Sequence, residues 1–535
     1  MEVGNFLTET YISLRKLENE VLKEYYKSRA NNNQIIIKEQ IIKVNINQFY
    51  GIEINDFGCK VAETALWIAE SQMIDETNEI LGTTLLEFPL NNNNNIHCKN
   101  ALRVDWNEII SNNELNYIIS NPPFTGKSDR NNVQKEDMKI VFRKDTKLDY
   151  VCAWYKKAFS YIEGRKIRVA FVSTNSIAQG EQPYELWNNI LGKTIKIDFA
   201  YTSFKWESSV KEEASVYCVI IGFSNIDTYN EKYLIDLKNV KNINGYLIDA
   251  PNIFLASRTH PLNAPKSIRF GSMPNDGGYL SNYSEYKKNE ICLKYPKAIE
   301  FFKLIMGAKE FINNKKRWCI WLDDVEPKEY NKIKPIMEAI KNVRNVRENS
   351  PRDETRKIAN KPMLFAEIRQ PNNDFLVIPE VSSEDRKYIP IGFLKRDVIA
   401  NNRLFTMENG DLYDFGVLSS KVHMAWTNVF CGRLEMRYNY SAKIVYNNFP
   451  WANPTDKQKQ KIEKTAQNIL EARAKYPNSS LGDLYNELTM PIELRNAHQE
   501  NDKAVMELYG FKNSLTENEI VAKLIDKYIE LLNKK

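Results

Sequence analysis

The residues best suited to chemistry form the tetrapeptide Asn121-Pro122-Pro123-Phe124, which directly follows an apolar, strand-like segment. The Asn121 side-chain oxygen and the Pro122 carbonyl can both accept hydrogen bonds from a planar NH2 group, and proline sets the carbonyl's direction in advance. Phe124 offers a ring for a base flipped out of a duplex. This arrangement suits methyl transfer to an exocyclic amine. Taken alone, the tetrapeptide is equally compatible with a plain turn.

Carboxylates that could hold a nucleoside cofactor occur earlier in the chain. Glu53 lies near the end of a predicted strand, where open parallel sheets bind ligands, and could accept from both ribose hydroxyls. Asp105 precedes the tetrapeptide by one short segment and could accept from an adenine amine. Each alone could be a solvated acid, and the glycine near the start could belong to a fraying terminus. The predicted cofactor-binding residues are Gly4, Asn5, Phe6, Glu53, Ile54, Asp105 and Trp106.

The elements that must position these residues alternate between helix and strand. Helices are predicted over 6–22 and 62–69, and strands over 49–54, 117–119, 169–172 and 216–221. This alternation predicts an α/β fold with an open, mostly parallel sheet and helices on both faces. Shorter strands such as 375–379 and a basic helix over 335–357 follow, and helical patterns dominate from residue 456. We therefore predict three domains: 1–230, 231–455 and 456–535.

Composition indicates the cellular location and argues against a bound metal. The chain of 535 residues has a net charge of +5, which permits a nucleic-acid partner without arguing for one. It has no apolar run of roughly 20 residues and no basic-then-apolar start, so we expect a cytoplasmic protein without a membrane partner. The seven cysteines and four histidines are scattered, which predicts reduced thiols and no metal.

The order of these motifs resembles a known family. A glycine-containing start, a strand-end glutamate, an aspartate and then Asn-Pro-Pro-Phe follow one another as in the adenine-N6 DNA methyltransferases of the MmeI-like restriction–modification family. Further segments also resemble that family, namely 49–73, 149–154, 170–182, 379–393 and 431–451. The resemblance implies a Rossmann-like methyltransferase core using S-adenosylmethionine, then a mixed α+β target-recognition domain for double-stranded DNA, then a helical C-terminal module.

The resemblance places base reading in the segment 430–440. Arginine can bridge guanine O6 and N7, and glutamate can accept from cytosine N4, so Arg433, Glu435, Arg437 and Tyr438 are the predicted readers. Alternation would place Arg433, Glu435 and Arg437 on one strand face. A solvated face with cross-strand ion pairs is the alternative. A second basic group is expected to contact phosphates or to lie on a simple exposed helix: Lys341, Arg344, Arg347, Arg352, Arg356 and Lys357.

The chain departs from the family at its start. Family members carry Asp-Pro-Ala-Cys-Gly-x-Gly-Asn-Phe-Leu, of which only Gly4-Asn5-Phe6-Leu7 is matched. We therefore expect the first strand and the start of the cofactor loop to be missing near the middle of the sheet. A separately encoded polypeptide with the nuclease and this motif could supply them. The alternative function is a truncated DNA-binding specificity module without catalysis. Methylation of RNA or of a protein glutamine is disfavoured by the long domain after residue 230.

Overall fold

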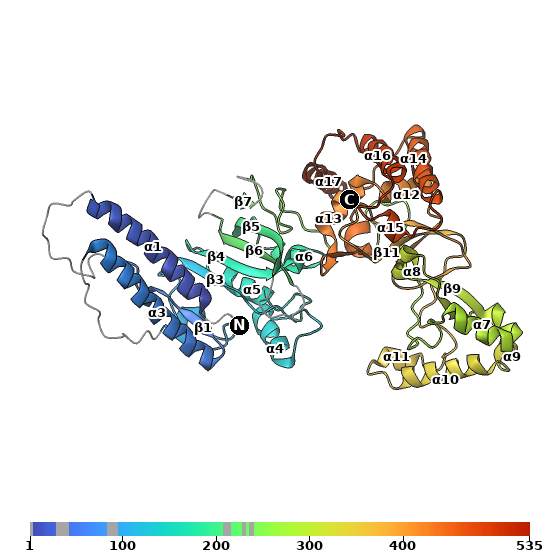
Figure 1. The fold of residues 1–535 in the computed structure, drawn as a ribbon, viewed down its shortest axis with the longest axis horizontal. Coiled ribbons are helices and arrows are strands. Elements are labelled where there is room, and N and C mark those ends of the chain that lie inside the picture. Colours follow the sequence, from blue (N-terminus) through green and yellow to red (C-terminus); the bar gives the residue numbers. More distant parts are fainter. Residues whose placement is uncertain are drawn as a thin grey trace. The chain divides into compact units, whose positions relative to one another are not determined.

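The computed structural model describes residues 4–27, 42–82, 95–206, 216–226, 232–234 and 240–534. The chain divides into two compact units, Met1–Ile177 with Glu185–Leu247 and Ala178–Tyr184 with Ile248–Lys535 (Figure 1). Across these residues, no helix combines the length and the apolar character needed to cross a membrane.

The elements up to residue 234 follow the predicted alternation of helix and strand. They are α1 (Asn5–Lys27), η1 (Ile46–Gln48), β1 (Gly51–Glu53), α3 (Asp56–Leu81), β2 (Ile96–Cys98), η2 (Trp106–Glu108), β3 (Tyr117–Ser120), α4 (Asn132–Phe142), α5 (Cys152–Tyr161), β4 (Arg168–Thr174), η3 (Asn175–Ala178), α6 (Gln182–Trp187), β5 (Ile195–Trp206), β6 (Val216–Asn225) and β7 (Tyr233–Leu234).

The described strands of the first unit form two sheets. Strands β1 and β2 pair in parallel as a two-stranded sheet, and the other five follow the order β3-β4-β6-β5-β7. The pairs β3–β4 and β5–β7 are parallel, whereas β4–β6 and β5–β6 are antiparallel. The α/β class is as predicted. The mostly parallel sheet is also as predicted, because β3, β4, β5 and β7 run in one direction and, among the described strands of this sheet, only β6 runs against them.

An aromatic core holds α5 against the five-stranded sheet. Tyr155 of α5 stacks on Phe223 of β6 with ring centroids 5.5 Å apart and meets Phe171 of β4 edge-on at 5.1 Å. The Tyr155 hydroxyl hydrogen-bonds Ser173 Oγ at 2.7 Å. Ring pairs of this kind add about 0.5–1.5 kcal/mol beyond the area they bury. The amino end of α5 therefore has a fixed position relative to the ends of β3 and β4.

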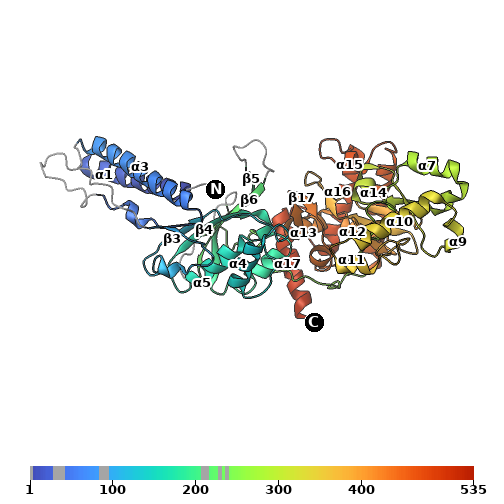
Figure 2. The same cartoon turned by 90° about the horizontal axis from the view of Figure 1, so that it is seen from below.

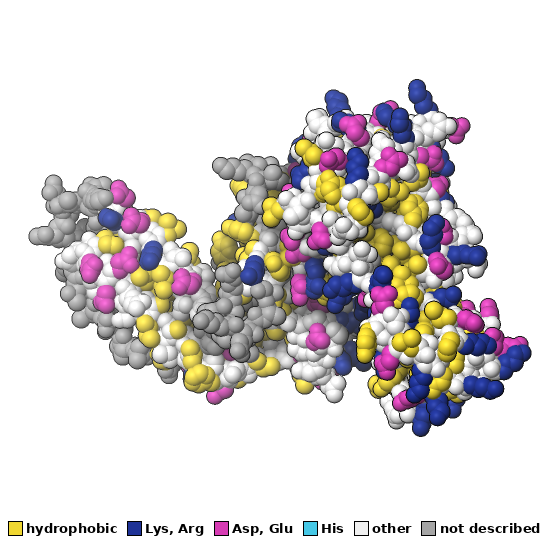
Figure 3. All heavy atoms as spheres, turned by 45° about the vertical axis from the view of Figure 1, so that its right-hand side comes forward, with side chains coloured by type: hydrophobic (Ala, Val, Ile, Leu, Met, Phe, Trp, Pro, Cys, Tyr) yellow, Lys and Arg dark blue, Asp and Glu magenta, His cyan; other side chains and the backbone are white. Residues whose placement is uncertain are grey.

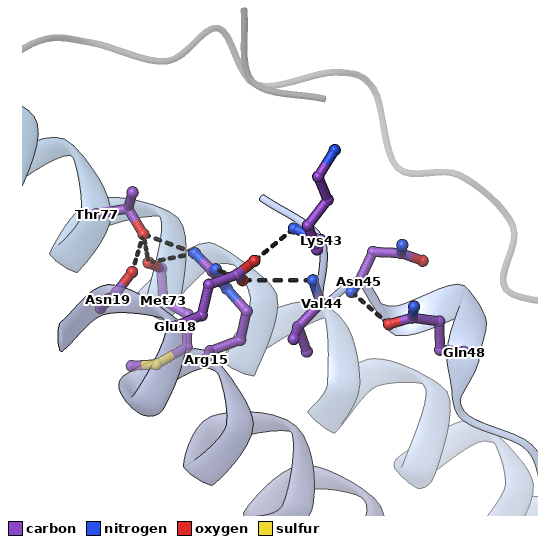
Figure 4. A network of polar contacts seen from close by, with 9 residues as sticks. All are labelled: Arg15, Glu18, Asn19, Lys43, Val44, Asn45, Gln48, Met73 and Thr77. Atoms are coloured by element: carbon purple, nitrogen blue, oxygen red, sulfur yellow. Dashed lines mark hydrogen bonds and ion pairs between the residues drawn. The ribbon is translucent and has the colours of Figure 1, made fainter. Parts of the chain in front are cut away.

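Helices α1 and α3 lie side by side in both views (Figures 1 and 2) and are joined by a buried polar network (Figure 4). The fully buried Arg15 of α1 donates to Thr77 Oγ1 of α3 at 2.6 Å and pairs with Glu18. Thr77 in turn donates to Asn19 Oδ1 at 2.7 Å. Glu18 also accepts from the backbone N–H of Lys43 at 2.5 Å. The network fixes the segment that leads toward β1.

The same helices share an apolar core with β1 and β2. Buried side chains from α1, η1, α3 and β2 make up one cluster: Tyr11, Ile46, Cys59, Ala62, Leu66, Ala69, Met73 and Ile96. The sheet β1–β2 is thus packed against its own pair of helices, and the described buried residues of this cluster include none from the five-stranded sheet.

The second unit combines small sheets with helices. Its elements are β8 (Arg269–Phe270), α7 (Glu285–Lys294), η4 (Pro296–Phe301), β9 (Phe302–Met306), α8 (Ala308–Asn313), β10 (Trp318–Ile320), α9 (Pro327–Tyr330), α10 (Lys334–Glu348), α11 (Asp353–Lys357), β11 (Phe375–Pro379), β12 (Val381–Ser382), β13 (Gly392–Leu394), β14 (Ile399–Ala400), β15 (Leu404–Glu408), α12 (Leu412–Leu418), α13 (Lys421–Phe430), β16 (Gly432–Leu434), β17 (Arg437–Asn439), η5 (Ala442–Tyr446), α14 (Asp456–Ala474), α15 (Leu481–Leu484), α16 (Ile492–Tyr509) and α17 (Glu517–Asn533). The sheet orders are β10-β9-β14, β13-β11-β15-β8 and β12-β17-β16.

The basic helix predicted over 335–357 is two helices, α10 and α11, separated near Pro351. Arg347 is 1% exposed and donates to five backbone carbonyls, at 2.8–3.3 Å: Pro274, Asn275, Ile358, Lys361 and Leu364. Its predicted phosphate contact was therefore wrong, because all five guanidinium N–H groups are already used. Lys341, Arg344 and Arg352 are exposed, whereas Arg356 pairs with Asp353 and Lys357 pairs with Glu354 at 3.1 Å.

A buried carboxylate joins the C-terminal helices to the preceding sheet region. Asp502 of α16 accepts from the Tyr388 hydroxyl and from the Lys421 backbone N–H, both at 2.7 Å. The Tyr388 ring stacks on His498 with centroids 4.1 Å apart. Burial raises the pKa of Asp502 from 3.8 to about 6, against the opposing effect of these hydrogen bonds. The carboxylate form therefore carries a desolvation cost above that pH.

This raised pKa predicts a pH-dependent stability. Protonated Asp502 contributes stability that is fully present below pH 3.8 and is lost as the pH rises through about 6. Urea unfolding at a series of pH values should show wild type losing on the order of 2–3 kcal/mol across this window relative to Asp502→Asn. Parallel pH profiles of the two proteins would contradict the assignment to Asp502.

Candidate active site and target-reading hairpin

The Asn-Pro-Pro-Phe loop begins where β3 ends at Ser120. Pro122 is buried, and Asn121 and Phe124 are half-buried. The Asn121 side-chain oxygen is shielded from water but has no hydrogen-bond partner among the residues that the structure describes. Buried polar atoms in native proteins are nearly always paired, so an unpaired acceptor at a loop needs an explanation. A donor brought by a substrate would satisfy it.

Neighbouring elements hold the loop in place. The Thr125 carbonyl accepts from the Tyr150 backbone N–H at 2.9 Å, next to the amino end of α5. The Thr125 hydroxyl oxygen accepts from Gln134 Nε2 of α4 at 3.2 Å. The buried Arg130 donates to the Thr146 carbonyl at 3.1 Å. The backbone after Phe124 is thus fastened to both helices, which sets where Asn121 and Pro122 present their oxygens.

Asp137 of α4 links this loop to the segment that carries Asp105. It is 1% exposed and accepts from the Tyr150 hydroxyl at 2.7 Å and from Arg103 Nε at 2.6 Å. Asn100 Nδ2 lies 3.4 Å from both of its oxygens. Burial, together with the bond to Asp137, raises the pKa of Tyr150, so its hydroxyl stays a donor. Sequence reasoning missed Asp137; the only signal was Tyr150 within the family-like stretch 149–154.

Replacing Asp137 by alanine is expected to leave the Tyr150 hydroxyl and the Arg103 Nε–H without acceptors. We expect a loss of about 1–3 kcal/mol in unfolding free energy, measured by urea denaturation. A double-mutant cycle between Asp137→Asn and Tyr150→Phe should give a coupling of roughly 0.5–3 kcal/mol. Lys135→Ala, on the exposed face of α4, is the control. Strict additivity in the cycle would show that the bond does not support the fold.

A second group of polar residues lies at the carboxyl end of β4. Ser176 donates its hydroxyl to Asp149 Oδ2 at 2.6 Å and lies 2.7 Å from the Thr174 hydroxyl. These contacts bring together the segments 149–154 and 170–182, which are far apart in sequence. They add hydroxyl and carboxylate groups to the same end of the sheet as the loop after β3, because β3 and β4 are parallel.

The two predicted cofactor carboxylates lie at the end of β1 and at the start of η2. Glu53 ends β1, and its Oε1 accepts from the Asn55 backbone N–H at 3.0 Å. Asp105 is exposed and caps η2, with Oδ1 accepting from the Asn107 N–H at 2.9 Å. In each carboxylate the second oxygen has no hydrogen bond to a described residue. Both residues can therefore accept from hydroxyl or amine groups of a bound nucleoside.

The other predicted cofactor residues differ in accessibility. Ile54 is 61% exposed, and Asn5 is exposed at the start of α1. Gly4 has φ +82°, and a Cβ there would lie 3.0 Å from Ala62 Cα, so glycine is required. Trp106 is buried against Tyr161, and its indole N–H donates to the Ala101 carbonyl at 2.9 Å. Trp106 therefore forms part of the wall behind Asp105.

The predicted base readers lie on a β-hairpin, not on one strand. Glu435 is in the turn between β16 and β17, with φ +60°. Arg433 faces Tyr438 across the hairpin, whereas Arg437 faces Leu434. The expectation that Arg433, Glu435 and Arg437 share one strand face was wrong, because the turn reverses the chain between them.

The four predicted base readers have two different roles in the hairpin: two support it and two lie at its tip. The Arg433 guanidinium lies 3.9 Å from the Tyr438 ring centroid and donates to the carbonyls of Met436 and Asn428, both at 3.1 Å. Tyr438 is 5% exposed. Glu435 and Arg437 are exposed and form an ion pair at 2.8 Å. The exposed charged groups therefore gather at the hairpin tip, while Arg433 and Tyr438 stiffen it.

Comparison with known proteins identifies the class. Three domain profiles cover almost the whole chain: the MmeI DNA-methyltransferase domain matches residues 2–236, the MmeI target recognition domain 249–453, and the MmeI C-terminal domain 454–534. The chain thus has a methyltransferase domain, a target-recognition domain and a C-terminal domain, and it belongs to the MmeI family.

Individual relatives agree with this. The chain is 39% identical over 543 residues to DNA methyltransferase A of Bacillus subtilis (strain 168), covering 99% of this chain and 60% of that protein. It thus spans about 60% of the length of this curated relative. It is 41% identical to the type IIL restriction-modification enzyme MmeI, whose structure was solved in complex with DNA. That match has a TM-score of 0.91 and covers 99% of this chain and 72% of that chain.

Proposed function

We propose that the chain is the methylating and target-reading part of a site-specific DNA methyltransferase of a restriction–modification system, acting on adenine N6. The observation that carries the proposal is the shielded, unpaired Asn121 oxygen at the end of β3, within a domain of the MmeI methyltransferase family. A flipped adenine would bring the missing donor, its exocyclic amine. Double-stranded DNA is the proposed partner.

The roles of the loop follow from its geometry. Asn121 Oδ1 and the Pro122 carbonyl accept the two N–H bonds of the amine and draw electron density onto nitrogen as it attacks. Pro123 keeps the loop rigid, and Phe124 stacks on the base. Because Thr125 is tied to Tyr150 and Gln134, both acceptors are in place before the base arrives, and little reorganisation is needed during the reaction.

S-adenosylmethionine is the proposed cofactor, and when bound it supplies an electrophilic methyl group. The donor set fits it: Glu53 offers a carboxylate oxygen to ribose hydroxyls, and Asp105 offers one to the adenine amine. Ile54 adds an exposed apolar side chain beside Glu53. Gly4, Asn5 and Phe6 would border the amino-acid portion, and Trp106 would hold Asp105 from behind.

We propose that the hairpin formed by β16 and β17 reads the DNA sequence. The proposed domains span residues 1–230, 231–455 and 456–535. Glu435 and Arg437 at its tip can accept from cytosine N4 and donate to guanine O6 and N7. Arg433 and Tyr438 would keep the tip in position. Exposed basic side chains on the part that carries α10 are suited to phosphates (Figure 3), with Lys341, Arg344 and Arg352 the candidates.

The test is incubation of the purified chain with tritiated S-adenosylmethionine and mixed-sequence duplex DNA, followed by digestion and chromatography of nucleosides. Label in N6-methyladenine supports the proposal, whereas label in another base or in protein contradicts it. The second candidate function is a DNA-binding specificity module that does not catalyse methylation. The separation of the β1-β2 sheet from the five-stranded sheet β3-β4-β6-β5-β7 favours this candidate. DNA binding without any incorporation would support that candidate.

A further inference from the structure

Two cysteines from different elements contact consecutive carbonyl groups at the end of β1. The buried Cys59 lies in the first turn of α3, which begins beside β1 (Figure 1), and its Sγ is 3.7 Å from the Glu53 carbonyl oxygen. The exposed Cys98 is the last residue of β2, and its Sγ is 3.8 Å from the Ile54 carbonyl oxygen. Each thiol donates to its carbonyl. Glu53 and Ile54 are also two of the predicted cofactor residues.

Backbone hydrogen bonds fix the positions of both cysteines. Asn55 caps α3: its side chain accepts from two N–H groups of the first turn, and its carbonyl accepts from the Cys59 N–H at 3.0 Å. Glu53 and Cys98 are paired residues of the parallel strands β1 and β2. The Glu53 carbonyl also accepts from the Lys99 N–H at 2.9 Å. The first turn of α3 and the end of β2 are therefore both held against the carboxyl end of β1.

The two thiols lie in different surroundings and affect one another. Cys59 belongs to an apolar cluster that also holds Ile96, two residues before Cys98. Burial raises the pKa of the Cys59 thiol to about 11, and the neighbouring Cys98 adds to this rise through its charge and a side-chain hydrogen bond. Cys59 therefore stays protonated at neutral pH. Of the seven cysteines, all of which lie in the described residues, Cys98 is the only exposed one. Because oxidants react with accessible thiolates, Cys98 should react first.

We propose that Cys98 and Cys59 form a redox site that takes peroxides and forms a disulfide between β2 and α3. The Cys98 thiolate attacks one peroxide oxygen, the O–O bond breaks, and Cys98 becomes a sulfenic acid. The Cys59 sulfur then attacks the Cys98 sulfur and the S–O bond breaks. The leaving hydroxide takes the Cys59 proton and departs as water. With hydrogen peroxide, two thiols and one peroxide give one disulfide and two waters.

The disulfide would alter the segment that carries Glu53 and Ile54. Oxidation removes both S–H donors, so the Ile54 carbonyl loses the Cys98 thiol, whereas the Glu53 carbonyl keeps the Lys99 N–H. A covalent bond also holds the sulfurs closer than two thiols in contact, so β2 and α3 must shift against the end of β1. The consequence for the cofactor rests on the proposed function: S-adenosylmethionine should bind the oxidised chain more weakly than the reduced chain.

Peptide mapping after peroxide treatment tests the disulfide. The reduced full chain is exposed to a small molar excess of hydrogen peroxide, alkylated, and digested without reductant. We expect a linked pair of peptides containing Cys59 and Cys98, lighter by two hydrogens than the two thiol peptides and separated again by dithiothreitol. The Cys98 thiol should disappear roughly tenfold or more faster than the thiols of the four other buried cysteines.

Single variants separate the two roles. Cys59→Ser should give no linked peptide and should leave Cys98 as a sulfenic acid, which dimedone traps. If this variant does not fold, Cys59→Ala suits the apolar cluster and serves the same purpose. Cys98→Ser, at an exposed position, should remove the fast reaction. Cys292→Ser is the matched control, because it removes a half-buried cysteine of α7 and should react as wild type does.

Three results would overturn the proposal: a disulfide that joins other cysteines, a dimer linked through Cys98, or oxidation of Cys98 to the sulfinic acid without a link to Cys59. Each would show that Cys59 does not resolve the oxidised Cys98.

Calorimetric titration with S-adenosylmethionine tests the consequence for the cofactor. We expect roughly tenfold weaker binding after oxidation, restored by dithiothreitol. Equal affinity in the two states would overturn the link between this redox site and the cofactor. Absence of binding in both states would contradict the proposed cofactor and leave the peptide-mapping result standing, so the two failures are distinguishable.

Discussion

Asn121→Ala is expected to lower methyl transfer by about 10²–10³-fold while leaving the fold as stable as before or slightly more stable. The reason is that Asn121 Oδ1 is shielded and has no hydrogen-bond partner in the described part of the chain, so its removal relieves a buried polar group rather than breaking a bond. The same atom is the proposed acceptor for the target amine. Loss of activity and gain of up to about 1 kcal/mol in stability should therefore come together.

Single-turnover incorporation of labelled methyl and urea denaturation measure the two effects on the same preparations. Asn113→Ala is the matched control, because Asn113 is exposed in the turn before β3. It should change neither quantity. Methylation by Asn121→Ala at the wild-type rate would refute the catalytic assignment. A marked loss of stability would show instead that Asn121 has a structural partner.

The second large effect is on stability. Arg347→Met should destabilise the second unit by about 3–5 kcal/mol, because it removes the donor to five backbone carbonyls and replaces a buried cation whose hydrogen bonds are all satisfied. Urea denaturation, with amide exchange to locate the loosened segment, measures this. Exchange should accelerate first in α11 and at residues 358–364, which these bonds hold against α10.

Arg344→Met, one turn earlier on the exposed face of α10, is the matched control and should change stability by less than about 0.5 kcal/mol. The two positions should also separate in DNA binding. Arg344 is a proposed phosphate contact, so its loss should reduce the slope of log affinity against log salt by about 1. If Arg347→Met instead stayed stable and gave that slope change, its burial would not matter for the fold.

The spacing of apolar side chains predicted several helices and strands correctly. The helix over 6–22 and the strands over 49–54, 117–119 and 169–172 all correspond to observed elements, namely α1, β1, β3 and β4. The Asn-Pro-Pro-Phe loop was placed correctly at the end of a strand, because an apolar run followed by two prolines has few other conformations.

Tertiary partners were not predictable in the same way. Asp137 lies on a polar helix, and nothing in its neighbourhood indicates that Tyr150 and Arg103 converge on it. Arg347 looked like one more cation in a basic helix, whereas the fold surrounds it with carbonyls that need donors. The break near Pro351 follows from proline chemistry, because the residue before a proline disfavours the helical conformation.

The hairpin failed for a different reason. The usual sequence signal of a two-residue hairpin turn is a glycine or asparagine at the position with positive φ. Here Glu435 occupies that conformation. The segment therefore read as one continuous strand. Glu435 is held in an unfavourable backbone conformation and pairs with Arg437. Such strain is compatible with a functional site, where the position of a side chain outweighs its conformational cost.

Asp137 has a consequence for how the two halves of the proposed site communicate. One carboxylate holds both the segment that leads to Asp105 and the residue that fastens the Asn-Pro-Pro-Phe loop. Any ligand that shifts Arg103 therefore acts, through the two oxygens of the Asp137 carboxylate, on Tyr150 and Thr125. Thermodynamic linkage makes such an influence reciprocal. If one ligand changes the affinity for a second ligand by some factor, the second changes the affinity for the first by the same factor.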